Sequence, residues 1–246
     1  MIESKIIFKG EIDPKDIVIR INKTSTLKIP LEIETEIEST WEKVYKESNE
    51  EGRKLYNGKI LRLDSFDIIK GKLEMTLSKI DFKTRVGIIE NLSRIKNITE
   101  DNLPKSIAIG GLVKTKDNKY IFGINSGKTM NKIPIDIIGG MIEPKTGEFS
   151  SEMIFDENYR ELKEELNVDR ENVKDLHIIG LILTSNAVVM FFTSCVLNIT
   201  VNEVQDKFKL HNDGEVKELL IVDPKNLNSK LNEFGGYKNL VIDLLN

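Results

Sequence analysis

Clustered glutamates at helical spacing, with one arginine beside them, are the residues in this sequence best suited to do chemistry. At 100° per residue, the carboxylates that fall on one side of a helix are those of Glu157, Glu161, Glu164 and Glu165. Like charges at these spacings repel one another, so this face gains stability only when a cation joins it. Carboxylate oxygens in such a cluster suit Mg²⁺ or Mn²⁺, above all where substrate phosphates complete the coordination. Arg160 lies beside the same face, where it can pair with a carboxylate and orient it.

The segment that carries these residues predicts an amphipathic helix over residues 151–166. Its apolar stripe consists of Phe155, Tyr159, Leu162 and Leu166. Asn167 follows the last turn, where a residue that tolerates the left-handed conformation is favoured. A solvated, charged surface helix is the alternative interpretation. Lysine is nearly absent from the acidic face, and a Gly-Gly pair at 139–140 precedes the helix, so we favour the metal site.

The elements that position this helix are clearest in the second half of the chain. Residues 107–114 and 119–124 flank Asp117-Asn118 and predict a hairpin. Further strands are expected at 176–183, 188–197 and 219–222, followed by a C-terminal helical stretch. This order predicts the α/β (α+β) class, with a mixed sheet that carries helices on its faces.

The first half has a mixed pattern and predicts a small α+β unit. We expect strands at 17–21, 59–63 and 73–77 and a helix within 36–55. The polar stretch 97–104 ends in proline and separates the two halves. We therefore predict an N-terminal domain over 1–100 and a second domain over 105–246.

Composition narrows the classes of function. The 246 residues include 36 Lys+Arg and 40 Asp+Glu, giving a net charge of −4, which argues against non-specific nucleic-acid binding. We expect no membrane span, since no uncharged stretch reaches about 18 residues. The single cysteine, Cys195, lies in a strand pattern and is expected to be buried rather than nucleophilic. With no targeting segment apparent, a cytoplasmic protein is the expectation; whether it forms a homodimer is left open.

The segment from Arg160 to Val168, with the sequence RELKEELNV, resembles the second half of the Nudix box, G-x5-E-x7-R-E-U-x-E-E-x-G-U, where U is aliphatic. Glu152 stands eight residues before Arg160, as in that pattern. Two positions depart from it: Asn167 replaces the final glycine, and Gly140 precedes Glu152 by twelve residues, which an insertion around 144–147 explains. The resemblance covers roughly 105–246 and implies a Nudix-type α/β/α sandwich.

The resemblance implies roles for individual residues. It makes Glu161, Glu164 and Glu165 ligands of Mg²⁺ or Mn²⁺, with the Gly140 carbonyl as a further ligand. Arg160 becomes the orienting partner and Glu152 a supporting carboxylate at the substrate site. Many family members add a carboxylate from a late loop, and in the acidic segment 213–218 we choose Glu215 as general base or ligand. A solvated loop acid is the alternative for Glu215.

Weaker signatures in the first half are similar to the Nudix branch that cleaves UDP-glucose and UDP-galactose to UMP and sugar 1-phosphate. They are Trp41, residues 55–63 and residues 81–87. Arg62 and Arg85 are then candidate phosphate contacts, with surface solvation as the alternative; Trp41 or Tyr56 can stack on a base, although a lone Trp is more often a core anchor. Residues 123–129 resemble a P-loop but lack its spacing and its helix, so Lys128 is expected only to lean over the phosphate site.

Three functions follow from these resemblances. The first is a Mg²⁺-dependent hydrolase of a nucleoside diphosphate linked to another group, with UDP-sugars as the leading substrates. The second is a Nudix pyrophosphatase for ADP-ribose, dinucleoside polyphosphates or a modified nucleotide. The third is a Nudix-like module that senses a nucleotide without turnover. The intact carboxylate set favours catalysis on a small-molecule nucleotide, and the missing DNA-binding helix pair and acidic pI disfavour a nucleic-acid partner.

Overall fold

The computed structural model describes residues 2–53, 55–128, 133–144, 149–211 and 214–245. Within these ranges eleven strands join in one mixed sheet. The strands are β1 (Lys5–Ile12), β2 (Ile17–Ile21), β3 (Lys59–Ile69), β4 (Lys72–Asp81), β5 (Ser106–Lys114), β6 (Tyr120–Asn125), β7 (Ile135–Asp136), β8 (Ile138–Met141), β9 (Val173–Leu183), β10 (Val188–Leu197) and β11 (Val216–Val222). The α-helices are α1 (Leu31–Glu34), α2 (Ile37–Glu50), α3 (Phe82–Glu90), α4 (Ser151–Leu166), α5 (Val201–Leu210), α6 (Leu227–Phe234) and α7 (Asn239–Leu245).

Strand β5 is the centre of the sheet. It pairs in parallel with β10 and antiparallel with β3, β6 and β8, and the main path runs β1-β9-β10-β5-β3-β4-β2. Strands β5 and β6 form the predicted hairpin, with Val113 opposite Ile121. The mixed sheet and its helices confirm the predicted α/β class.

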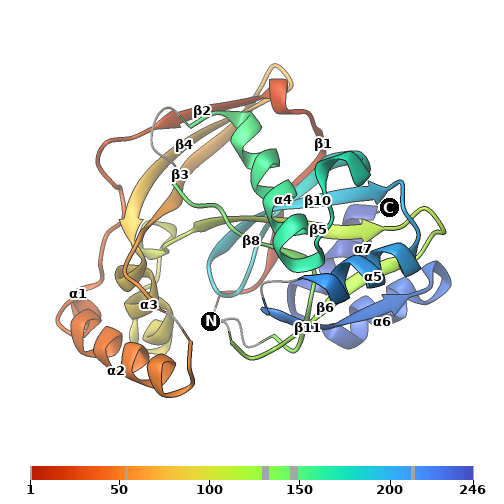
Figure 1. Cartoon of the computed structure of the whole chain (residues 1–246). Helices are drawn as coiled ribbons and strands as arrows, with labels where there is room; N and C mark the ends of the chain where they lie inside the picture. The colour runs from red at the N-terminus through yellow and green to blue at the C-terminus, as the bar shows by residue number, and fades with distance from the viewer. Residues whose placement is uncertain (1, 54, 129–132, 145–148, 212–213, 246) are drawn as a thin grey trace.

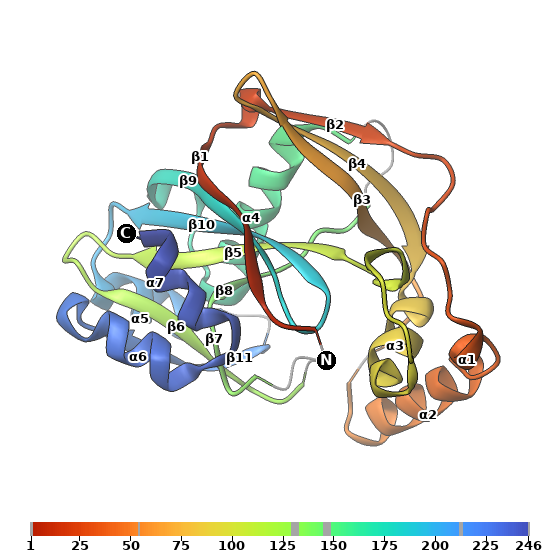
Figure 2. The same cartoon turned by 180° about the vertical axis from the view of Figure 1, so that it is seen from behind.

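Helices cover the second half of the sheet on two faces (Figures 1 and 2). On one face, α4 and α5 bury Leu162, Leu166 and Val204 in a common apolar cluster. On the other, α6 and α7 bury Leu231 and Val241 against a second cluster. These two layers fix α4 against β5 and β8, which is the position that matters for the site.

In the first half of the chain, strands β2, β3 and β4 form one end of the sheet, and helices α1 to α3 lie together beside it (Figure 2). Strand pairing crosses the predicted boundary near residue 100 in two places. Strand β1 pairs with β9, and Arg62 of β3 pairs with Ser106 of β5. The division into two domains stays a prediction, and the two halves share one sheet.

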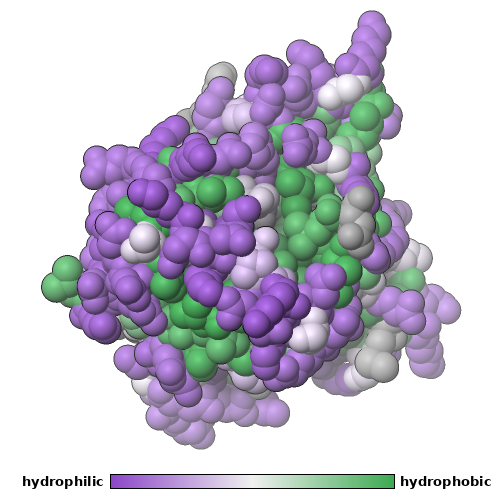
Figure 3. All heavy atoms as spheres, turned by 90° about the vertical axis from the view of Figure 1, so that its right-hand side faces the viewer, coloured by the Kyte–Doolittle hydropathy of each residue, from purple (hydrophilic) through white to green (hydrophobic). Residues whose placement is uncertain are grey.

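Helix α4 begins and ends where the sequence predicts. Its apolar stripe is buried or packed against the core. Asn167 caps the C-terminal end of the helix in the left-handed conformation, with φ 56°. No helix in the described part of the chain is long and apolar enough to cross a membrane. Hydrophilic side chains cover most of the face drawn in Figure 3, and apolar groups are exposed between them.

Candidate functional site

Helix α4 presents its glutamates at a partly buried face rather than to open solvent. Glu157, Glu161 and Glu165 are exposed by only 1%, 6% and 7%. The Glu164 side chain is exposed by 43% and lies at the open edge of the group. This burial is inconsistent with the alternative of a solvated surface helix, because carboxylates leave water only where partners compensate them.

Arg160 joins the carboxylates of its own helix. Its Nε donates to Glu157 Oε1 at 2.8 Å, one terminal nitrogen contacts Glu161 Oε1 at 2.5 Å, and the other contacts Glu164. Burial by itself lowers the pKa of Arg160, but the three carboxylates together raise it above its ordinary value. Arg160 thus contacts three carboxylates of α4, and its role in orienting them stays a prediction.

Glu161 lies at the centre of the negative charge. Burial raises the pKa of Glu161 to about 8; Arg160 opposes this, and Glu164, Glu157 and Glu215 raise it further. Burial and the neighbouring carboxylates therefore outweigh the effect of the Arg160 guanidinium on Glu161.

Strand β8 packs against the carboxylates with two glycines. The Gly139 N–H donates to Glu165 Oε2 at 3.2 Å. A Cβ on Gly139 would lie 2.3 Å from the Ile109 carbonyl oxygen, and one on Gly140 would lie 2.3 Å from Glu161 Oε1. The Gly-Gly pair is therefore required for close packing of β8 between β5 and α4.

The late loop approaches the same site. Glu215 acts electrostatically on Glu161, as expected of a carboxylate near the predicted ligands. The Ser126 N–H donates to the Glu215 carbonyl at 2.8 Å, which joins the loop after β6 to the start of β11. Lys128 is exposed on this loop, and its Nζ lies 3.5 Å from where a Cβ on Gly214 would be. Asp213 and the predicted insertion at 145–147 lie outside the described residues.

Tyr56 brings the first half of the chain to the site. Its hydroxyl donates to Glu143 Oε1 at 3.0 Å, just after β8, and its ring is exposed by 66%. The bond to Glu143 raises the pKa of Tyr56, and Arg160 acts on it in the opposite direction. Trp41 instead packs on Tyr45 and Phe82 and is only half-buried, so the core-anchor interpretation stays a prediction.

Three predicted substrate contacts lie elsewhere in the structure. Glu152 is exposed in the first turn of α4, about 180° around the helix from Glu161. Arg62 is 1% exposed and donates to Leu103 and Thr26, so surface solvation is wrong for it. Arg85 donates to Ser106 Oγ at 3.0 Å, and burial lowers its pKa. Arg62 and Arg85 thus contact these other groups, and the substrate roles of Glu152, Arg62 and Arg85 stay predictions.

One cluster beside the site has no signal in the sequence. The Tyr237 hydroxyl donates to Asp136, and Lys238 Nζ lies 3.3 Å from the same carboxylate, with both residues buried. Glu165 is among the groups that raise the pKa of Tyr237, after burial and Asp136. Tyr237 and Lys238 stand some seventy positions after the helix, and no motif links them to it.

The donor set suits a divalent cation by its chemistry. Hard carboxylate oxygens gather around the buried Glu161, whose pKa is raised first by burial and then by Glu164, Glu157 and Glu215, and Gly140 leaves the space before it free of a side chain. Among the described residues, no three His, Cys, Asp or Glu side chains form a ready-made ligand group. Glu161 and Glu164 both pair with Arg160, so a metal requires Glu161 or Glu164 to turn from it.

Comparison with solved structures finds low-identity likenesses. DR0079 from Deinococcus radiodurans is 16% identical over 56% of this chain and 80% of its own, with a TM-score of 0.39. The candidate Nudix hydrolase Tm1382 is 13% identical over 76% and 98%, with a TM-score of 0.43. The Nudix hydrolase RenU from M. smegmatis is 9% identical over 50% and 72%, with a TM-score of 0.30. No protein-family model and no curated protein matches the chain, so its function must be inferred from its own residues.

Proposed function

We propose that this protein is a metal-dependent hydrolase that cleaves the diphosphate linkage of a nucleoside diphosphate bound to another group. The observation that carries the proposal is the buried Glu161 carboxylate against the bare Cα of Gly140, with Glu157, Glu164 and Glu165 on the same helix. Such a site attracts a divalent cation, and a cation attracts phosphates.

Glu161, Glu164 and Glu165 would hold the cation, with the Gly140 carbonyl beside them. A bound Mg²⁺ or Mn²⁺ would neutralise charge that develops on the diphosphate and assist the attack of water. Arg160 stays paired with the buried Glu157 while Glu161 or Glu164 turns to the cation, and the Gly139 N–H fixes Glu165. Glu215 is the general base in this proposal, and Lys128 on the adjoining loop attracts the phosphates.

UDP-sugars are the first substrates to test. Tyr56, which comes from the first half and has an exposed ring next to Glu143, is the residue we propose for stacking on the base. ADP-ribose, dinucleoside polyphosphates and nucleoside triphosphates are the competing substrates. Arg62 is left out of this site because it donates to Leu103 and Thr26 and pairs with Asp64, and Arg85 because its Nε donates to Ser106.

The experiment is a hydrolysis screen of these nucleotides with Mg²⁺ and Mn²⁺, with products identified by mass. Glu164→Gln and Glu165→Gln should each lower the rate by orders of magnitude in folded protein. Asp156→Asn is the matched control, since Asp156 is exposed on the same helix and pairs with Arg170 at 3.1 Å. UMP and a sugar phosphate as products would support the UDP-sugar branch, whereas turnover of another nucleotide would discard it.

Absence of turnover across the panel, together with tight binding of one nucleotide, would contradict hydrolysis and support the sensing module. Near-normal turnover by both glutamine variants would remove the metal-ligand assignment. Glu215→Gln should depress the rate with little change in Mn²⁺ affinity; an unchanged rate would exclude Glu215 as the base.

A further inference from the structure

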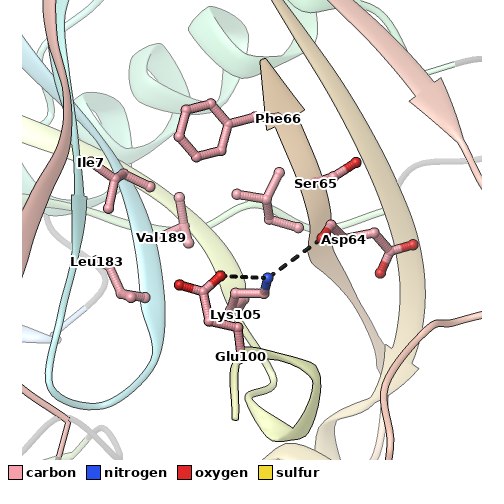
Figure 4. Close-up of a pocket in the computed structure, with 9 residues that line it drawn as sticks. Ile7, Asp64, Ser65, Phe66, Glu100, Lys105, Leu183 and Val189 are labelled. Atoms are coloured by element: carbon pink, nitrogen blue, oxygen red, sulfur yellow. Dashed lines mark hydrogen bonds and ion pairs between the residues drawn. The ribbon is translucent and has the colours of Figure 1, made fainter.

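A cavity lies apart from the α4 carboxylate site, between strand β1, strand β3 and the β9–β10 pair (Figure 4). Its volume is about 220 Å³. Its lining combines apolar side chains with polar and charged ones: Ile7, Leu63, Phe66, Leu183 and Val189, and Asp64, Ser65, Glu100 and Lys105. None of its lining residues belongs to the site proposed above.

One ammonium group is buried at this cavity. The Lys105 side chain is only 9% exposed, and the pKa of Lys105 is lowered by burial first and by Arg62 second. Its Nζ lies 3.7 Å from the Glu100 carboxylate and 3.4 Å from the Asp64 carbonyl oxygen. Both distances exceed the 2.7–3.2 Å of ordinary hydrogen bonds, so this cation is weakly compensated for so buried a group.

The neighbouring carboxylate of Asp64 serves another cation. It pairs with Arg62 and accepts from Thr26 and Ser78, and Figure 4 shows it directed away from the Lys105 ammonium. The nearest anion to Lys105 is therefore Glu100, whose side chain is 66% exposed. Because the Glu100 carboxylate is largely in water, its ion pair with Lys105 is weak, and the carboxylate of a ligand can displace it.

The backbone holds Lys105 in this position under strain. Its φ is +31°, in the left-handed region that a lysine rarely adopts. Hydrogen bonds fix the segment on both sides, from Leu63 N–H to the Lys105 carbonyl and from Ser106 N–H to the Ala187 carbonyl. A strained residue that is held in place to bury a charge is typical of binding sites.

We propose that this cavity binds a small monocarboxylic acid with a compact apolar group. The carboxylate would replace Glu100 at Lys105, and the apolar group would contact Phe66, Ile7 and Val189. A neutral ligand would leave the ammonium uncompensated. A dianion would meet only one available cation and the nearby Glu100. The volume lies below the roughly 300–1,000 Å³ of pockets for drug-sized ligands, which limits the occupant to a short acid.

The test is binding of isovalerate to the full chain by titration calorimetry and ligand-observed NMR. Lys105→Met should weaken binding about tenfold or more, since a hydrogen bond to a charged group is lost. Lys5→Met is the matched control: Lys5 also contacts Glu100, at 3.5 Å, but its side chain is 56% exposed. Binding to that variant should stay within about twofold, as for other exposed ion pairs.

Two further measurements keep the proposal open to refutation if Lys105→Met does not fold. Glu100→Gln should tighten isovalerate binding, because it removes the competing carboxylate, and Ile7→Trp should abolish it by filling the cavity. 3-Methylbutan-1-ol and inorganic phosphate should bind more weakly than isovalerate. Equal binding of the alcohol, unchanged binding to folded Lys105→Met, or no saturable binding to either the native chain or Glu100→Gln would overturn the proposal. None of these readouts depends on hydrolytic activity.

Discussion

Gly140→Ala is the substitution that best separates the chemistry of the carboxylate site from its stability. Gly140 lies outside the left-handed region, so its backbone accepts alanine. The added Cβ would lie 2.3 Å from Glu161 Oε1 and 2.7 Å from its Cδ. Carbon and oxygen atoms approach to about 3.3 Å in weak hydrogen bonds, so the carboxylate must withdraw by about 1 Å.

That displacement gives the expected magnitude. A misplacement of about 1 Å in a catalytic group costs about 100-fold in rate. The atom displaced is the end of a side chain, so overpacking should lower the free energy of unfolding by only about 1–3 kcal/mol. The assay is metal-dependent hydrolysis of the best nucleotide from the screen, with Mn²⁺ affinity measured by electron paramagnetic resonance and stability by urea unfolding.

Gly87→Ala is the matched control for this steric effect. A Cβ on Gly87 would lie 2.9 Å from Ile37 Cγ1 in the α2–α3 pair, far along the chain from the carboxylates. It should alter stability to a comparable extent and leave the rate unchanged. Full activity and Mn²⁺ affinity in folded Gly140→Ala would refute the placement of Glu161 at the reaction centre. Equal losses of activity in Gly140→Ala and Gly87→Ala would show that the effect is destabilisation alone.

Three further predictions concern stability and reactivity. Arg62→Met should lower the free energy of unfolding in urea by about 3–5 kcal/mol, because it leaves the buried Asp64 without its cation. Arg20 is exposed, and Arg20→Met should lower it by less than about 1 kcal/mol. Equal losses in the two variants would contradict the buried pair. Burial raises the pKa of Cys195 to about 12. A disulfide reagent at pH 8 should therefore leave the native protein unmodified and react with its one thiol after denaturation. Rapid labelling of the native protein would show that the thiol is accessible. Asn167→Ala should lower the free energy of unfolding by about 1–2 kcal/mol, because alanine is strained in the left-handed conformation of residue 167. Asn167→Gly should be more stable than Asn167→Ala, because glycine adopts that conformation without strain. The reverse order in thermal unfolding would contradict this.

Local pattern by itself determined much of the second half. The 3.6-residue period determined α4, its apolar stripe and the shared face of Glu157, Glu161 and Glu165, because these depend only on spacing within one helix. Alternation and turn residues likewise predicted the β5–β6 hairpin and the β9 and β10 strands. Strand β1 and helices α3 and α5 were not predicted as such.

Tertiary structure decided which charges meet. Whether an arginine is buried or solvated depends on what packs over it. The sequence left phosphate contact and surface solvation open for Arg62 and Arg85, and the fold buries Arg62 and pairs Arg85 with the buried Ser106. The approach of Tyr56 and Glu215 to helix α4, and the burial of Lys105 in a cavity, bring together residues far apart in the chain. Such contacts arise from strand order and layer packing, which no local period of the sequence encodes.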